Sequence, residues 1–242
     1  MNLDRRFWAV GPRRPAGERT PVVARDRIAG GTVVLKYAPS SRDELARELR
    51  AEGARLSELS HPSLLPLRAR FDGVRDPWGD DRVVGFATPW IDGANLIDGL
   101  AEQPIAVRLT AFAQLLDVSQ YMHRRGLLHL DLKPDNVLVS LADADGAPRL
   151  TLLDLGSARP LDAGPGEAGG TLGYAAPEVL TGQAASIAAD VFSLGAILYE
   201  LLTGSPAFPG EDGSDIRRAV LAGEVFPVRA LAPSVPRGLA QV

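Results

Sequence analysis

The chain has 242 residues, enough for one two-lobed domain or two small ones. Its net charge of -4 argues against a nucleic-acid partner, and the absence of cysteine excludes disulfides, zinc–thiolate sites and thiol nucleophiles. No apolar run is long enough to span a membrane, and residues 1–14 lack the apolar core of a secretion signal. We therefore expect a cytoplasmic protein with no membrane segment in this chain.

The first part of the chain is rich in short apolar runs separated by turn residues. Over residues 7–37 this alternation predicts three antiparallel strands joined by hairpins. A helix is predicted over 42–59, with Ser41 as its N-cap. Its apolar stripe is Leu45, Leu49, Leu56 and Leu59. Two further strands and the turn between them are expected at 66–71, 82–88 and 72–81.

After Gly93 the pattern becomes mainly helical. A helix ended by Gly126 is predicted to bury four apolar residues spaced along one face, namely Ile105, Leu109, Phe112 and Leu116. Short strands are expected at 136–139 and 150–153, around a turn at 143–148. Residues 190–202 are apolar on nearly every side, which indicates a helix buried in a core.

These elements predict an α+β, bilobal fold, with an antiparallel sheet and one helix in the first lobe and a mainly helical second lobe. The lobes are expected at 1–89 and 90–242, with a seam near 89–93 where a ligand would bind. The chain ends in what is predicted to be the start of another helix at 236–242. We therefore expect missing C-terminal helices and further domains beyond Val242.

Lysine is rare in this chain, and its two occurrences stand out. Of 26 basic residues only Lys36 and Lys133 are lysines, while the remainder are arginines. A lysine kept against that background suggests a place where a compact, strongly hydrated point charge is needed.

A cluster of polar residues can carry phosphoryl-transfer chemistry, which needs an oriented acceptor, metal ligands and cations. Asp131 and Asn136, five residues apart on one loop, can face the acceptor and a metal respectively. Lys133 can point the same way as Asp131 and reach the transferred group. Asp154 follows an apolar run and precedes Gly156, which places it at a strand end as a second hard-oxygen metal ligand.

Four ordered motifs resemble those of eukaryotic-type Ser/Thr protein kinases of bacterial style. Residues 129–136 (HLDLKPDN) resemble the catalytic loop and 154–156 (DLG) the magnesium-binding element. Residues 170–178 (GTLGYAAPE) resemble the substrate-side loop, and 190–195 (DVFSLG) the start of the central helix. Lys133 is typical of Ser/Thr rather than Tyr kinases, and the likeness covers essentially the whole chain.

The resemblance implies ATP and Mg²⁺ as cofactors. Lys36 and Lys133 then stand where such kinases place lysines beside the phosphates. The expected partner of Lys36 is Glu52, which lies on the apolar stripe and would be costly to bury unpaired; Glu48 is the alternative. Thr171 is expected to hydrogen-bond near Asp131 and Lys133.

The three histidines are interpreted as structural. His61 and His129 are expected to be packing or spine residues, and His123 a helix-surface or packing residue.

The nucleotide base is expected to contact the segment Thr88 to Ile91. The resemblance implies that Pro89 offers its carbonyl and Ile91 its backbone N–H, so a proline without an N–H is compatible with binding. The apolar residues expected around the adenine are Val22, Val34 and Leu138.

The glycine-rich loop departs from the family pattern. With Val22 aligned to the family's valine, residues 15–20 keep only Gly17 of three glycines. Side chains there keep phosphates away from backbone amides. Glu18 adds a repelling charge, and Arg19 is a possible substitute contact. This favours a rival interpretation, a pseudokinase scaffold with weakened ATP binding.

Two further departures concern regulation and the C-terminus. Leu130 replaces the arginine that usually binds a phosphorylated activation loop, and Ser157 is the one hydroxyl side chain between Asp154 and Thr171. We therefore expect activity that does not need activation-loop phosphorylation. Glu178 lacks its usual arginine partner, for which Arg229 and Arg237 are the candidates.

The reading favoured by the sequence is a Ser/Thr kinase acting on a protein hydroxyl. Asp131 accepts the substrate proton, Lys133 offsets phosphoryl charge, and Asn136 and Asp154 hold the metal. A third reading, a small-molecule phosphotransferase, is disfavoured by the peptide-binding loop at 171–178.

Overall fold

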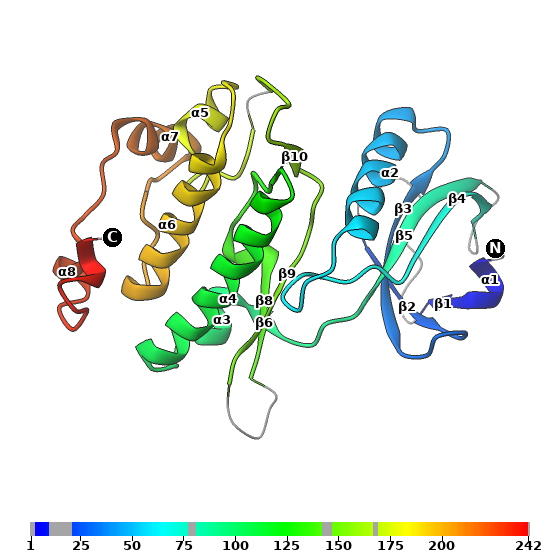
Figure 1. Cartoon of the computed structure of the whole chain (residues 1–242), viewed down its shortest axis with the longest axis horizontal. Coiled ribbons are helices and arrows are strands. Elements are labelled where there is room, and N and C mark those ends of the chain that lie inside the picture. Colours follow the sequence, from blue (N-terminus) through cyan, green and yellow to red (C-terminus); the bar gives the residue numbers. More distant parts are fainter. Residues whose placement is uncertain (1–2, 10–20, 77–80, 142–146, 167–168, 242) are drawn as a thin grey trace. The chain divides into compact units, whose positions relative to one another are not determined.

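The computed structural model of the chain describes residues 3–9, 21–76, 81–141, 147–166 and 169–241. It divides into two compact units (Figure 1). The first comprises residues 1–92 together with 154–156, and the second comprises 93–153 together with 157–242. The tripeptide 154–156 therefore packs with the first unit, although its neighbours along the chain belong to the second.

The first unit contains a five-stranded antiparallel sheet in the order β1-β2-β3-β5-β4. Its elements are α1 (Leu3–Arg6), β1 (Phe7–Ala9), β2 (Val22–Asp26), β3 (Thr32–Pro39), α2 (Asp43–Glu58), β4 (Ala69–Arg75) and β5 (Arg82–Pro89). The three expected N-terminal strands and the expected helix are all present.

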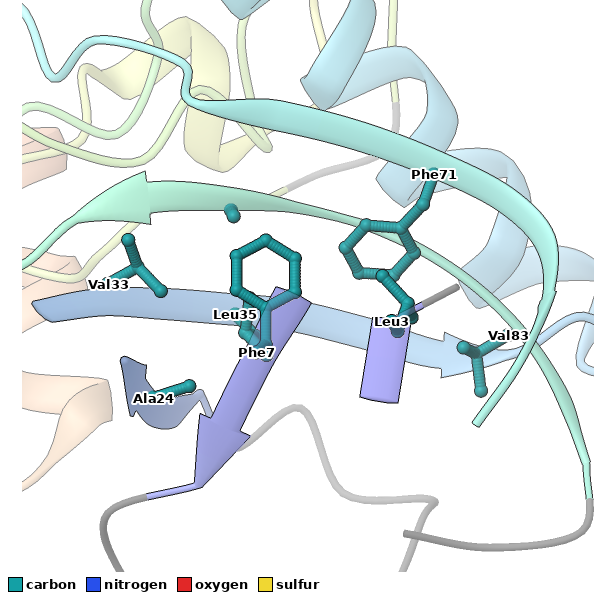
Figure 2. Close-up of a cluster of buried hydrophobic side chains, with 8 residues drawn as sticks. Leu3, Phe7, Ala24, Val33, Leu35, Phe71 and Val83 are labelled. Atoms are coloured by element: carbon teal, nitrogen blue, oxygen red, sulfur yellow. The ribbon is translucent and has the colours of Figure 1, made fainter. Parts of the chain in front are cut away.

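An apolar cluster covers one face of this sheet. Strand residues alternate between faces, so Val33 and Leu35 point into the cluster while their neighbours point to the other face. Figure 2 shows Leu3 and Phe7 reaching from the N-terminal segment into this cluster. The same segment is tied to the sheet by Arg6, which pairs with the buried carboxylate of Asp26 at 2.9 Å.

Helix α2 packs against β3 and β5 through the face that carries Ala46, Leu49, Glu52, Gly53 and Leu56. The prediction of Ser41 as N-cap is wrong. The helix begins one residue later than expected, so Arg42 takes the N-cap position and no side chain caps the helix. From the preceding position the Ser41 hydroxyl is not the capping group.

The predicted bounds of β4 are also wrong. The strand begins at Ala69 and continues to Arg75, through residues that were expected to form a turn. Its register shifts between Phe71 and Val74, and Gly73 has φ +60° there. The turn residues therefore build an irregularity within the strand, because a glycine can adopt the left-handed conformation that a bulge requires.

The second unit is mainly helical, as expected. Its helices are α3 (Leu96–Leu100), α4 (Ile105–Arg124), α5 (Pro177–Leu180), α6 (Ile187–Thr203), α7 (Gly213–Ala222) and α8 (Val228–Leu231), with 3-10 turns at Pro134–Asn136 and Leu239–Gln241. Its strands are β6 (Ala94–Asn95), β7 (Leu127–Leu128), β8 (Val137–Ser140), β9 (Arg149–Leu152) and β10 (Arg159–Pro160). They form two small sheets, β6-β8-β9 and β10-β7.

The predicted core face of α4 is wrong in part. Ile105 and Leu116 are exposed, and the helix buries Ala111, Phe112, Leu115, Val118, Ser119 and Met122. The buried face is centred on Leu115, Val118 and Met122 and is therefore rotated from the predicted stripe, of which it keeps Phe112. Gly126 has φ +74° just beyond the helix, which agrees with its expected role at the helix end.

Helix α6 buries most of its length, as the sequence predicts, although Ile187 and Val191 are exposed. The helix expected at 236–242 is instead a short 3-10 turn at Leu239–Gln241. None of the helices within the described ranges combines the length and apolar character needed to cross a membrane.

Candidate active site

In the first unit, Lys36 lies between two carboxylates. Its Nζ is 2.9 Å from Glu52 Oε1 and 3.2 Å from Asp154 Oδ2. The alternation of β3 places Lys36 on the face opposite the apolar cluster, where α2 presents Glu52. Glu48, the alternative partner, is exposed. The structure thus places Lys36 against Glu52, the residue expected from burial.

Burial and charge act in opposite senses on this pair. Burial alone would lower the pKa of Lys36, but attraction by Glu52 and Asp154 outweighs it and raises the pKa. Burial raises the pKa of Glu52, and the negative charge of Asp154 adds to that rise against the opposing effect of Lys36. Two carboxylates therefore compete for one ammonium group, an arrangement in which an added cation near Asp154 would relieve repulsion.

The Asp154-Leu155-Gly156 turn is tightly held within the first unit. Asp154 has φ +38°, which is unusual for a residue with a side chain. The Gly156 N–H donates to Asp154 Oδ1 at 2.9 Å. A Cβ added at Gly156 would lie 3.0 Å from the same Oδ1, so a side chain there would press on the carboxylate. A residue with a side chain at position 156 would therefore require the Asp154 carboxylate to shift.

The placement of Val22 near the nucleotide is wrong. Val22 pairs with Leu35 and packs against the apolar cluster, on the face opposite Lys36. Val23 pairs with Val34 and therefore shares the Lys36 face. A shift of one residue along a strand moves a side chain to the other face, and the sequence contained two adjacent valines.

This register also changes the reading of the glycine-rich loop. Gly17 itself lies outside the described residues. With Val23 in place of Val22 as the family's valine, the three glycine positions of the motif fall on Ala16, Glu18 and Pro21. The sequence then keeps none of the three glycines, and Gly17 drops out of the motif.

The end of β5 carries the residues expected to contact the base. Thr88 is buried, and Trp90 donates its N–H to the Thr32 carbonyl at 2.9 Å. The Ile91 N–H makes no hydrogen bond to another residue of the described ranges. The Ile91 N–H is therefore a free donor, and it directly follows the Trp90 N–H, which is the last donor that the sheet uses. Leu138, in the second unit, is half-buried in β8 and pairs with Thr151.

In the second unit, Asp131 is the centre of a polar network. Thr171 Oγ1 donates to Asp131 Oδ1 at 2.6 Å, and Lys133 Nζ donates to Thr171 Oγ1 at 2.7 Å. Lys133 Nζ also lies 3.1 Å from Asp131 Oδ2. Asn136 Nδ2 donates to the Asp131 backbone carbonyl at 2.8 Å and to Oδ2 at 3.0 Å. Three residues from two distant segments thus fix the Asp131 carboxylate, with Thr171 where it was expected.

The loop that carries Asp131 is anchored by a buried carboxylate that the sequence interpretation missed. Asp190, at the start of α6, is 1 % exposed. It accepts the backbone N–H groups of His129 at 2.9 Å and Leu130 at 2.8 Å. Its Oδ2 also lies 2.7 Å from His123 Nε2. An acidic residue opening a helix that is otherwise apolar was the available signal, because a buried charge must have partners.

The hydrogen bonds of Asp190 shift its pKa and correct the interpretation of His123. Burial would raise the pKa of Asp190, but the bonds from His123, His129 and Leu130 outweigh burial and lower it. His123 is therefore a hydrogen-bond partner of a buried carboxylate and not a surface residue. His129 is structural, as expected, since the Asp131 N–H donates to its Nδ1 at 3.3 Å.

Leu130, which replaces the arginine usual at this place in the family, makes apolar contacts. It adopts φ +63°, and it is buried in a cluster with Leu128, Ala176 and Ala189. Val179 and Phe192 pack against the same cluster. The residue before Asp131 is thus joined to the segment after Thr171 by apolar packing.

The expected partners of Glu178 are not found. Within the part of the chain that the structure describes, its carboxylate pairs with neither Arg229 nor Arg237. Arg229 Nη2 instead donates to the Pro233 carbonyl at 3.3 Å. The nearby Tyr174 does pair with a carboxylate, since its hydroxyl donates to Glu200 Oε2.

Comparison with known proteins agrees with this geometry. A protein kinase domain model matches residues 20–235. The chain belongs to the protein kinase family, and its bacterial relatives are of the Ser/Thr class. It is similar to the serine/threonine-protein kinase PkaA of Streptomyces coelicolor, with 32% identity over 90% of this chain and 40% of that protein. It is also similar to PknJ of Mycobacterium tuberculosis, with 36% identity over 80% of this chain and 33% of that protein.

A similarity of the same size extends to eukaryotic kinases. Calcium/calmodulin-dependent protein kinase type 1 of Macrobrachium nipponense is 32% identical over 82% of this chain and 55% of that protein. The chain spans about a third to a little over half of the length of these curated relatives.

Proposed function

We propose that this domain transfers the γ-phosphoryl group of ATP to a serine or threonine hydroxyl of a protein substrate. The observation that carries the proposal is the network around Asp131, where Thr171, Lys133 and Asn136 hold one carboxylate by hydrogen bonds and charge. A carboxylate fixed in this way can orient a hydroxyl and take its proton.

Each member of the network has a distinct proposed role. Asp131 accepts the proton of the acceptor hydroxyl. Lys133, whose ammonium is shared with Asp131 and Thr171, offsets negative charge on the transferred group. Thr171 fixes the orientation of both side chains, since it donates to one and accepts from the other.

The first unit is proposed to hold the nucleotide. Lys36, kept in place by Glu52, contacts the phosphates. The Pro89 carbonyl and the free Ile91 N–H bind the base, with Val23 and Val34 on the Lys36 face as apolar neighbours. Leu138 of the second unit is the remaining proposed contact with the adenine. The unit that comprises residues 1–92 and 154–156 thus carries the proposed phosphate contact and the proposed backbone contacts with the base.

The donor set fits Mg²⁺, which prefers hard oxygen ligands and is often completed by substrate phosphates. Asp154 supplies a carboxylate. Asn136 uses its amide N–H groups on Asp131, so its side-chain oxygen is left to bind a metal. When bound, Mg²⁺ would supply positive charge that offsets the negative charge on the transferred phosphoryl group.

The rival function is a scaffold that does not bind Mg²⁺·ATP, and the loss of all three motif glycines favours it. Thermal unfolding separates the two. At a ligand concentration about 100-fold above Kd, the kinase proposal expects Mg²⁺·ATP to raise the Tm by roughly 5–10 °C. Asp154→Ala should abolish the shift, and Asp43→Ala, on the exposed first turn of α2, should keep it. No shift in the unmodified protein would support the scaffold.

We further propose that activity does not require phosphorylation between Asp154 and Thr171. The apolar packing of Leu130 against Ala176 holds the segment after Thr171 in place, as a phosphate–arginine contact would otherwise do. Phosphatase treatment is therefore expected to leave the rate of peptide phosphorylation unchanged within about twofold. Loss of activity, together with phosphate mapped to residues 157–171 of the untreated protein, would contradict the proposal.

The protein substrate, any domains beyond residue 242 and a cytoplasmic location stay predictions. Labelled ATP incubated with the protein and either a Ser/Thr peptide or small hydroxyl compounds distinguishes a protein kinase from a small-molecule phosphotransferase. We expect transfer to the peptide alone.

A further inference from the structure

The turn that carries Asp154 needs more support than its own hydrogen bond provides. It belongs to the first unit while Leu153 and Ser157 on either side belong to the second. Asp154 also holds a left-handed backbone conformation that costs free energy for a residue with a side chain. Lys36 contacts the carboxylate, but that contact does not fix the backbone of the two residues that follow.

Arg55 of helix α2 provides a contact to that backbone. Its Nη1 donates to the Leu155 carbonyl at 3.0 Å and approaches the Gly156 carbonyl at 3.5 Å. Both carbonyls belong to the two residues directly after Asp154. A guanidinium suits this task, because its N–H groups form charge-assisted hydrogen bonds and its charge persists when it is partly buried.

The position of Arg55 on α2 links two functional groups. Arg55 follows Glu52 by three residues, so both side chains project from neighbouring positions on one side of the helix. Glu52 holds Lys36, and Arg55 holds the turn that carries Asp154. Helix α2 therefore carries Glu52, the partner of the proposed phosphate ligand Lys36, and also Arg55, which holds the turn of the proposed metal ligand Asp154.

We propose that Arg55 is a positioning residue that fixes the Asp154 turn in its metal-binding conformation and couples it to helix α2. It touches neither the carboxylate of Asp154 nor the groups proposed to bind the base. This inference rests on the proposed function for its consequence, Mg²⁺ affinity, but not for the contact itself.

The variant Arg55→Met tests the proposal, because it keeps most of the apolar stem and removes the donors. Arg47→Met is the matched control, since Arg47 lies on the same helix and its Nε donates within α2, to the Asp43 carbonyl. Arg55→Lys keeps the charge and an ammonium donor group in place of the guanidinium, so it should restore part of the effect. All three variants should retain the Tm of the unmodified protein within a few degrees.

The first measurement is hydrogen exchange of the Gly156 amide without nucleotide or metal. This amide reports on the turn directly, because it donates to Asp154 Oδ1. We expect its exchange to accelerate roughly tenfold in Arg55→Met, the effect of losing one charge-assisted hydrogen bond. Arg47→Met should show no change, and Arg55→Lys an intermediate one. Unchanged exchange of Gly156 in Arg55→Met would overturn the proposal.

The second measurement is the Mg²⁺ concentration needed for half-maximal ATP binding. Arg55→Met should raise it roughly tenfold, while ATP binding in EDTA stays as in the unmodified protein. An equal loss of ATP affinity with and without Mg²⁺ would contradict a role confined to the metal-binding turn. If the unmodified protein binds no Mg²⁺·ATP, the proposed function fails, and Gly156 exchange alone still decides whether Arg55 holds the turn.

Discussion

Asp131→Asn is expected to lower kcat for peptide phosphorylation by a factor of about 10²–10⁴, the usual contribution of a positioned general base. Asparagine has nearly the same shape and can still accept from Thr171, but its NH₂ group would face the donors of Asn136 and Lys133, so thermal unfolding of the variant checks that the loop keeps its conformation. Asparagine cannot take up the proton of the acceptor hydroxyl. Steady-state kinetics with labelled ATP measures the change.

The control for this prediction is a second neutralised carboxylate in the same loop. Asp135 is exposed and lies four residues from Asp131, so Asp135→Asn changes the net charge equally without touching the network. Its kcat should stay within about threefold. The Mg²⁺·ATP thermal shift of Asp131→Asn should match that of the unmodified protein, because Asp131 is not a proposed nucleotide or metal ligand. Full activity in Asp131→Asn would remove Asp131 from the chemistry.

Asp190→Asn is expected to destabilise the second unit by about 3–5 kcal/mol, the cost of breaking a buried charged network by removing one partner. The carboxylate accepts the N–H groups of His129 and Leu130 and faces His123. An amide has one oxygen where the carboxylate has two, and its NH₂ group would face a donor. Denaturant unfolding measures the loss, with Glu102→Gln as an exposed carboxylate control that should change stability by less than about 0.5 kcal/mol.

The same carboxylate gives stability a dependence on pH. Its pKa is lowered in the folded protein, so its stabilising contribution is complete above the unfolded-state value of about 3.9 and is lost as the pH falls toward the folded value. The histidines that act on it are His123 of α4 and His129 of the loop. As the pH falls below about 4, the free energy of unfolding should therefore decrease less in Asp190→Asn than in the unmodified protein. An identical acid profile in both proteins would contradict this assignment.

Several contacts between side chains could be predicted from the sequence, because the requirement behind each one is visible in a short segment of the chain. Glu52 lies on the apolar stripe of α2, and a carboxylate there needs a cation, which identified it as the partner of Lys36. The position of Thr171 came from motif resemblance, and the structure brings its hydroxyl to Asp131. In β3, Lys36 and Leu35 lie on opposite faces because successive strand residues alternate.

Other predictions failed where neighbouring residues were equivalent in sequence. Val22 and Val23 are the same residue type, and only the pairing with β3 shows which one faces Lys36. Helix α4 has adjacent leucines at Leu115 and Leu116, and only its packing shows that Leu115 is the buried one. The partners of Asp190 are backbone N–H groups about 60 residues away, and its place at the start of an apolar helix indicates that it needs partners but not which ones.

By itself the sequence determined the kinds of chemistry present: two lysines in a chain of arginines, an aspartate and an asparagine five residues apart, and an acidic residue before a glycine. The tertiary structure decided which atoms meet. Strand register chose Val23 over Val22, and helix α2 brought Arg55 to the carbonyls after Asp154. Composition and spacing follow from the chain alone, whereas contacts between distant segments depend on how those segments pack, because hydrogen bonds act only over about 3 Å.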